Sequence, residues 1–129
     1  MPVFQMLILP VIDNTATGST TWSSNANAPW LTPARMVWYR NMYLPNQSDW
    51  TNWDVSPNLA PKELLAKSPL TWIAIAELDI LCKEAESYGA LLKEVGVKTD
   101  VRVYEGSTHS LLILDGMLPP NLCLLLEFS

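Results

Sequence analysis

The chain has few of the residues that mark disulfide-rich or metal-binding proteins. Its 129 residues include two cysteines and one histidine. Two cysteines are too few for the disulfide framework of a small secreted domain, and Cys82 and Cys123 are not spaced as metal ligands. We therefore expect no metal, no cofactor and a reduced, cytoplasmic setting.

Positive charge and long apolar runs are also scarce. The chain has 8 basic and 13 acidic residues, a net charge of -5 and no basic cluster, which excludes nucleic acid as the main partner. Hydrophobic residues make up 49% of the chain, which excludes intrinsic disorder. No apolar run approaches the ~20 residues that cross a bilayer, and the N-terminus lacks a basic region. We expect neither a membrane span nor a signal peptide.

Three short apolar segments predict the strands of one parallel sheet. Residues 5–12 and 71–77 are nearly continuous apolar runs, which are typical of strands buried on both faces. Residues 99–104 alternate, with Val101 and Val103 on one side. A chain of this length forms one domain, so we expect a single α/β domain over residues 1–129.

Helix signals lie between and after the first two strands. Thr32 followed by Pro33 predicts a helix over 33–44, and residues 62–66 leave room for one short turn. The clearest helix follows residue 79 and ends before Gly96. Its expected core positions are Leu81, Ala85, Tyr88, Leu92 and Val95, and its expected solvent positions are Lys83, Glu84, Glu86, Lys93 and Glu94.

Two residues that can do chemistry follow neighbouring strands. Asp79 and His109 each come just past a predicted parallel strand, and the carboxyl ends of such strands share one edge of the sheet. Asp79 can orient one ring nitrogen of His109 and leave the other as a general acid or base. In the alternative interpretation, Asp79 is only a helix N-cap and His109 only a solvent-facing loop residue.

The segments that carry these two residues resemble a known family. Glu77-Leu-Asp79-Ile-Leu-Cys-Lys-Glu84-Ala is similar to the Asp-Pro-Leu-Arg-Asp-Glu-Gly segment of hormone-sensitive-lipase-like α/β-hydrolases. Tyr104-Glu-Gly-Ser-Thr-His109 resembles that family's Tyr-Pro-Gly-x-x-His. The resemblance implies that Asp79 and His109 are the acid and the histidine of a Ser-His-Asp triad, in a partial α/β-hydrolase fold of the esterase and lipase type.

The resemblance extends to the middle of the chain but omits two elements of the family. Residues 19–68 resemble a cap and connecting segment, whose helix carries Trp38. The chain lacks the Gly-x-Ser-x-Gly nucleophile elbow and the His-Gly-Gly oxyanion-hole segment, so it resembles a truncated C-terminal half. Ser107 and Ser110 lack the flanking glycines of a nucleophile elbow. We expect both to form local hydrogen bonds.

These observations lead to two functional hypotheses. In the first, His109 and Asp79 act on an apolar carbonyl-containing small molecule, contacted by Trp38, Ile80 and Leu111. The dyad then either moves protons by itself, as in cyclisation or isomerisation, or serves hydrolysis with a serine from another chain. In the second hypothesis, the chain is a catalytically silent binding or assembly subunit, or a truncated product without function.

The first strand also predicts association. Its outer edge is apolar and has no partner strand in the sequence, and such edges recruit other chains. We expect a homodimer or a complex with a complementary chain, with Phe4, Met6 or the run Leu124-Leu125-Leu126 at the contact.

Overall fold

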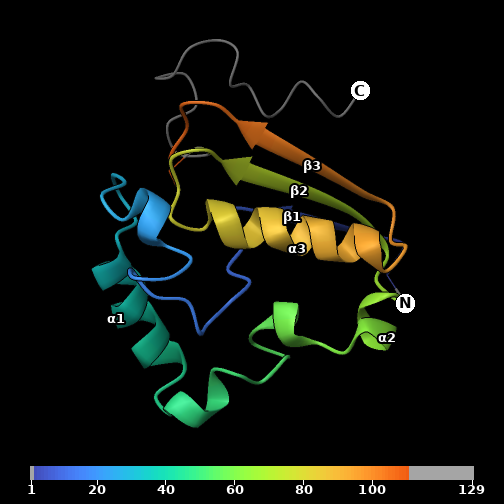
Figure 1. The fold of residues 1–129 in the computed structure, drawn as a ribbon, viewed down its shortest axis with the longest axis horizontal. Coiled ribbons are helices and arrows are strands. Elements are labelled where there is room, and N and C mark those ends of the chain that lie inside the picture. Colours follow the sequence, from blue (N-terminus) through green and yellow to red (C-terminus); the bar gives the residue numbers. More distant parts are fainter. Residues whose placement is uncertain (1, 111–129) are drawn as a thin grey trace.

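The computed structural model describes residues 2–110, and its centre is a three-stranded parallel sheet (Figure 1). The strands are β1 (Phe4–Ile8), β2 (Leu70–Ala76) and β3 (Thr99–Tyr104), in the spatial order β1-β2-β3. Phe4 is paired with Leu70, and Thr71 with Thr99. The α/β class and the three parallel strands are as the sequence predicts.

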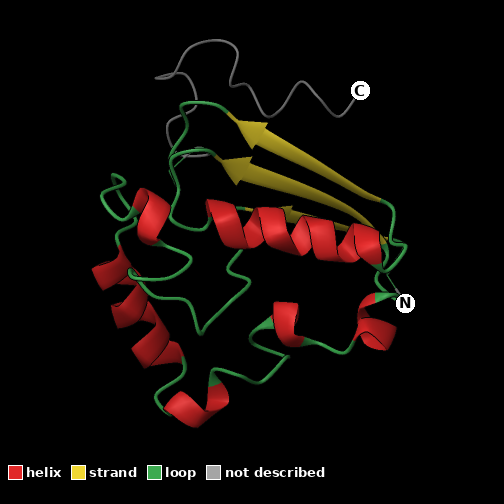
Figure 2. Cartoon of the chain, in the orientation of Figure 1, coloured by secondary structure: helices red, strands yellow, loops and turns green. Residues whose placement is uncertain are grey.

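Three α-helices and three short 3-10 turns connect and flank the strands (Figure 2). The helices are α1 (Pro33–Tyr43), α2 (Lys62–Leu65) and α3 (Cys82–Glu94). The turns are η1 (Ser23–Asn25), η2 (Gln47–Asp49) and η3 (Pro57–Leu59). In the described chain, no helix is both long and apolar enough to span a membrane.

Helix α3 covers one face of the sheet and forms the main core with it (Figure 1). Ile73 and Ile75 of β2 are almost fully buried against Leu92 of α3. The helix lies close to the sheet, because an added Cβ at Gly89 would be 2.6 Å from Cγ2 of Val101. Gly96 has φ +88, so the predicted glycine terminates this helix in the left-handed conformation.

Strand β1 differs from its prediction in length and in burial. It ends at Ile8, because Leu9 has a positive φ of 49 and Pro10 has no N–H to continue the ladder. It is also not buried on both faces: Phe4 is 43% exposed and Met6 is 42% exposed. Among the described residues, β1 pairs with β2 alone and forms one edge of the sheet.

Helix α1 starts as the sequence predicts and buries only a narrow stripe. The Thr32 hydroxyl accepts a hydrogen bond from the backbone N–H of Arg35, at 3.3 Å, and Pro33 occupies the first turn. Only Met36 and Arg40 of the helix are buried. The other large apolar and aromatic side chains of the helix are exposed: Val37, Trp38, Tyr39, Met42 and Tyr43.

Candidate active site

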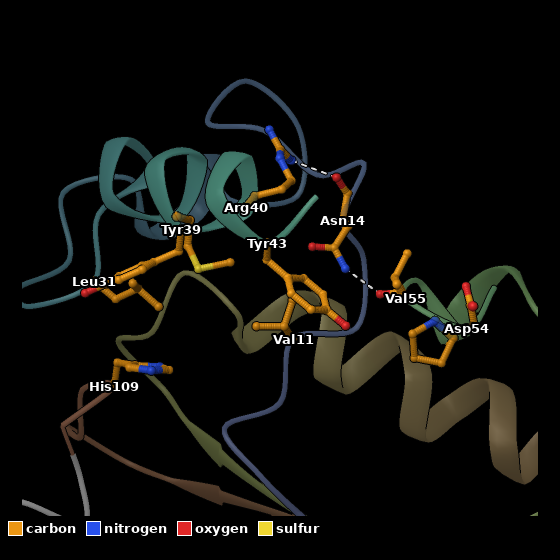
Figure 3. Close-up of a pocket in the computed structure, with 11 residues that line it drawn as sticks. Val11, Asn14, Leu31, Tyr39, Arg40, Tyr43, Asp54, Val55 and His109 are labelled. Carbon is orange, nitrogen blue, oxygen red and sulfur yellow. Dashed lines mark hydrogen bonds between the residues drawn. The ribbon is translucent and has the colours of Figure 1, made fainter. Parts of the chain in front are cut away.

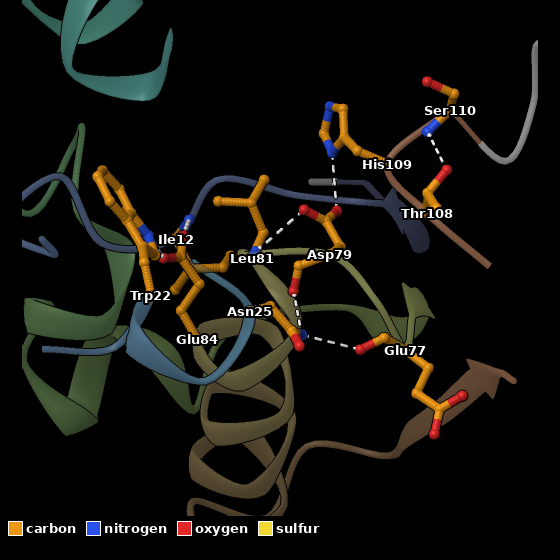
Figure 4. Close-up of polar contacts among 10 residues, drawn as sticks. All are labelled: Ile12, Trp22, Asn25, Glu77, Asp79, Leu81, Glu84, Thr108, His109 and Ser110. Carbon is orange, nitrogen blue, oxygen red and sulfur yellow. Dashed lines mark hydrogen bonds and ion pairs between the residues drawn. The ribbon is translucent and has the colours of Figure 1, made fainter. Parts of the chain in front are cut away.

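The loops that follow β2 and β3 bring Asp79 and His109 together (Figure 4). The His109 Nδ1 atom lies 2.7 Å from Oδ2 of Asp79. This contact is the one predicted from the shared edge of the strands. The Asp79 side chain is 1% exposed and that of His109 is 34% exposed, so a buried carboxylate holds a ring that solvent can reach.

The alternative interpretation, in which Asp79 is the N-cap of the next helix, is wrong: α3 begins at Cys82, its N-cap is Leu81, and no side chain caps it. The Oδ1 of Asp79 accepts a hydrogen bond from the backbone N–H of Leu81 at 3.1 Å, while Oδ2 contacts His109. The side-chain amide of Asn25 donates to the backbone carbonyls of Glu77 and Asp79, at 2.9 and 2.8 Å. One oxygen of the Asp79 carboxylate therefore binds a backbone N–H of the loop before α3, and the other contacts the imidazole.

The loop that carries His109 is fastened to the loop that carries Asp79. The Glu77 carboxylate accepts a hydrogen bond from the backbone N–H of Gly106 at 2.7 Å. The N–H of Leu78 donates to the carbonyl of Ser107 at 2.9 Å. Gly106 has φ +67, a conformation that glycine adopts without steric cost. These contacts hold the loop of His109 against the loop of Asp79.

His109 forms part of the wall of a cavity of about 520 Å³ (Figure 3). The cavity lies between α1, the segment after β1 and the segment before η3. Its lining residues are Val11, Asn14, Leu31, Met36, Tyr39, Arg40, Tyr43, Asp54, Val55, Pro57 and His109. Most of this lining is apolar or aromatic, which suits the body of an apolar small molecule.

Arg40 connects the walls of this cavity. Only 4% of it is exposed, and its Nη1 donates to the carbonyls of Asn14 and Ala16, at 2.8 and 2.7 Å. The guanidinium also lies 3.9 Å from the ring centroid of Trp50 and 5.5 Å from that of Trp22. Burial lowers its pKa below the usual value. Because carbonyls and aromatic rings surround it, Arg40 holds the wall in place.

Glu84 was predicted to face solvent, and that prediction is wrong. The residue is 3% exposed, and its Oε1 accepts hydrogen bonds from the backbone N–H groups of Ile12 and Asp13, at 2.7 and 3.2 Å (Figure 4). Its Oε2 accepts one from Nε1 of the fully buried Trp22 at 2.9 Å. Burial raises the pKa of this carboxyl. The spacing of residues along α3 does not show that the N–H groups of Ile12, Asp13 and Trp22 point toward the helix.

The predicted substrate contacts are not brought together around His109. Trp38 is 58% exposed and lies edge-on to Tyr39, and the cavity is lined by Tyr39 and not by Trp38. Ile80 is fully buried in a cluster with Met36 and is not part of the cavity wall. Leu111 lies outside the described residues.

Ser107 and Cys82 are both buried. Ser107 is fully buried, and its hydroxyl donates to the carbonyl of Tyr104 at 2.5 Å, as expected of a local partner. Cys82 is buried and its thiol pKa is raised to about 11, mainly by burial, while Cys123 lies outside the described residues. Within residues 2–110, no group of three or more His, Cys, Asp or Glu side chains could hold a metal ion.

Sequence comparisons identify the family to which this fold belongs. The alpha/beta hydrolase fold family matches residues 1–113. The chain belongs to that family. It is 38% identical over 118 residues to an AB hydrolase superfamily protein of Schizosaccharomyces pombe, an alignment that covers 90% of this chain and 35% of the relative. An esterase of Gibberella moniliformis is 28% identical over 98 residues, covering 75% of this chain and 31% of the esterase.

Solved structures of esterases share the fold of this alpha/beta hydrolase. Carboxyl esterase 2 of Tuber melanosporum superposes with a TM-score of 0.84 at 30% identity, covering 89% of this chain and 38% of the esterase. A thermostable esterase from Pseudomonas putida has a TM-score of 0.83 at 27% identity, covering 92% of this chain and 37% of the esterase. The chain thus spans roughly a third of the length of its curated relatives.

Proposed function

We propose that this alpha/beta hydrolase uses His109 as a general acid or base on an apolar carbonyl-containing small molecule, with Asp79 as the group that orients the ring. The observation that carries the proposal is the 2.7 Å contact between His109 Nδ1 and the buried Asp79 carboxylate. Because Nδ1 is engaged, Nε2 is the nitrogen left to exchange a proton with a substrate. The cavity beside the ring provides a site for the apolar body of that substrate.

Two reactions fit this pair of residues. These 129 residues contain no Gly-x-Ser-x-Gly segment, so hydrolysis through an acyl-enzyme requires a serine and an oxyanion hole from outside them. The names of the esterase relatives and the open edge of β1 favour such a completed hydrolase. Proton transfer next to a carbonyl, as in isomerisation or cyclisation, needs only the base. A binding subunit without catalysis is the alternative if neither reaction occurs.

The proposal is tested by proton exchange on a neutral ketone, which needs no nucleophile. His109 Nε2 would take an α-proton from 4-nitroacetophenone, leaving the enolate, and would return a deuteron from D2O. We expect the chain to accelerate this exchange, as followed by NMR, and His109→Ala and Asp79→Asn to lose about 10²-fold of that acceleration. The control is Lys98→Gln, because Lys98 is exposed and immediately precedes β3, whereas His109 follows that strand's other end.

The exchange experiment has two informative failures. If the unmodified chain does not accelerate exchange, the proposal that it moves protons by itself is wrong, and the silent binding subunit is favoured. If His109→Ala exchanges protons as fast as the unmodified chain, the base is another residue. Hydrolysis of 4-nitrophenyl butyrate by the isolated chain would contradict the need for a serine from elsewhere.

A further inference from the structure

A second cavity, of about 310 Å³, shares three lining residues with the first. Its lining residues are Trp30, Leu31, Arg35, Tyr39, His109 and Ser110. Leu31, Tyr39 and His109 belong to the walls of both cavities. His109 therefore borders both cavities.

Arg35 provides the positive charge of the second cavity. Its side chain is exposed, and its Nη1 donates to the backbone carbonyl of Trp30 at 2.7 Å. None of the ion pairs formed within residues 2–110 involves Arg35. Residues 14–48 contain no Asp or Glu, although the chain has 13 acidic residues. The guanidinium thus has N–H donors for a ligand and no carboxylate within its own segment to compete for them.

The backbone next to Arg35 is strained in a way that positions the guanidinium. Trp30 has a positive φ of 73, which is rare for a bulky residue. In this conformation its carbonyl oxygen accepts the hydrogen bond from Arg35, while its side chain, 55% exposed, forms part of the cavity wall. Backbone strain of this kind is found mainly at binding and catalytic sites. It persists only where the surrounding structure holds it in place.

The arginine of the first cavity is buried, whereas Arg35 is exposed. Arg40 is 4% exposed, donates to two backbone carbonyls and is stacked on Trp50. Its Nη1 is thus engaged within the protein, whereas its buried Nε has no hydrogen-bond partner among the described residues. The two cavities beside His109 therefore differ in their arginine, which is buried in the larger cavity and exposed in the smaller.

We propose that Arg35 binds a carboxylate group of the substrate in the smaller cavity. The substrate class is then an apolar carbonyl compound that also carries a carboxylate, with its apolar body in the larger cavity and its reacting carbonyl beside His109. Arginine recognises carboxylates through two parallel N–H···O bonds, which fix orientation as well as charge. This assignment rests on the proposed function for the position of the reacting carbonyl, whereas the binding of the anion is independent of catalysis.

The test compares two probes of nearly equal shape, phenylacetate and the neutral phenylacetamide. Binding to the unmodified chain at pH 8 is followed by NMR through the imidazole signals of His109, the single histidine of the chain. We expect the Kd of phenylacetate to be at least tenfold lower than that of phenylacetamide. Arg35→Gln should remove this difference by weakening phenylacetate alone, and Arg35→Lys should restore part of it.

Three controls keep the result specific. Lys98→Gln, which also removes one exposed positive charge, should leave both Kd values unchanged. Raising the salt concentration should weaken phenylacetate more than phenylacetamide. Circular dichroism should give Arg35→Gln the same melting temperature as the unmodified chain within about 2 °C, because the side chain is exposed.

Two outcomes would overturn the assignment: equal Kd values for the two probes in the unmodified chain, or an unchanged phenylacetate Kd in Arg35→Gln. A failure of the proposed function appears differently. If α-proton exchange is absent but Arg35→Gln still weakens phenylacetate alone, the anion site stands and the catalytic proposal fails.

Discussion

The contact between Asp79 and His109 joins two residues that are 30 positions apart in the chain. Asp79 is buried by the start of α3, whereas His109 stands at the end of a hydrogen-bonded loop. A buried carboxylate at 2.7 Å from Nδ1 favours the tautomer with the proton on that nitrogen. The contact therefore predicts which of the two ring nitrogens of His109 carries the proton.

We predict the Nδ1–H tautomer for neutral His109. Because the chain has one histidine, a long-range proton–nitrogen correlation spectrum contains a single imidazole and assigns the tautomer without mutagenesis. Asp79→Asn should shift the population toward Nε2–H, since the amide presents a donor as well as an acceptor. A dominant Nε2–H form in the unmodified chain would contradict the orienting role of Asp79.

Glu84 leads to a prediction about pH and stability. Burial raises its pKa in the folded chain above the usual value of 4.5. The folded state then binds its proton more tightly than the unfolded chain does, so this group's contribution to the free energy of unfolding falls as pH rises from 4.5 through the folded pKa. Urea unfolding should show that the stability of the unmodified chain relative to Glu84→Gln decreases across this window.

The matched control for Glu84 is Glu105→Gln, because Glu105 is exposed and forms no ion pair within residues 2–110. The difference in free energy of unfolding between Glu105→Gln and the unmodified chain should change less with pH than the difference between Glu84→Gln and the unmodified chain. A pH-independent difference between Glu84→Gln and the unmodified chain would show that the Glu84 carboxyl is not perturbed by folding.

At the scale of elements, α3 determines how the site is built. The helix begins three residues after Asp79, carries Glu84 toward the segment after β1, and packs on the sheet through Gly89. Its position relative to β3 therefore affects both the core and the loop that ends at His109. The close approach at Gly89 is the contact most sensitive to substitution, because a Cβ there would lie 2.6 Å from Val101.

We predict that Gly89→Ala destabilises the fold although alanine is the better helix former. The overlap with Val101 costs about 1–3 kcal/mol, which outweighs the gain of roughly 1 kcal/mol from helix propensity. Adding Val101→Ala should make the Gly89→Ala substitution less costly, because it removes the overlapping methyl group. Urea unfolding of the two single variants and the double variant measures this coupling, and additive effects would contradict it.

At the scale of the whole molecule, the described chain leaves apolar surface on β1 and α1 uncovered. Phe4 and Met6 of the edge strand are each more than 40% exposed, and Met42 and Tyr43 of α1 are more than 65% exposed. Surface of this kind favours association. The residues 124–126 that were also predicted at a contact lie outside the described residues.

We predict that the purified chain associates at micromolar concentration. Sedimentation equilibrium should give a mass above 14.4 kDa. Met6→Lys, which places a charge on the exposed edge strand, should weaken the association. A monomer of 14.4 kDa in the unmodified chain would contradict this prediction.

The missing elbow leads to a separate prediction for the isolated chain. A fluorophosphonate reacts with serines that a base and a strained turn have activated, and the chain has no such turn around Ser107 or Ser110. We expect no labelling under conditions that label a known serine esterase completely. Stoichiometric labelling of either serine would show that the chain has its own nucleophile.

The sequence by itself determined the parallel strands, the capped helix after Thr32 and the proximity of Asp79 to His109. These follow from local signals, namely apolar runs, an N-cap beside proline and the rule that parallel strands end at one edge. Tertiary structure decided what local signals do not encode. Glu84 is buried because distant backbone donors meet it, and Tyr39 rather than Trp38 faces the cavity because α1 has one particular rotation. The burial of Glu84 and the orientation of α1 depend on contacts between segments far apart in the chain. The residue pattern within a single segment does not predict such contacts.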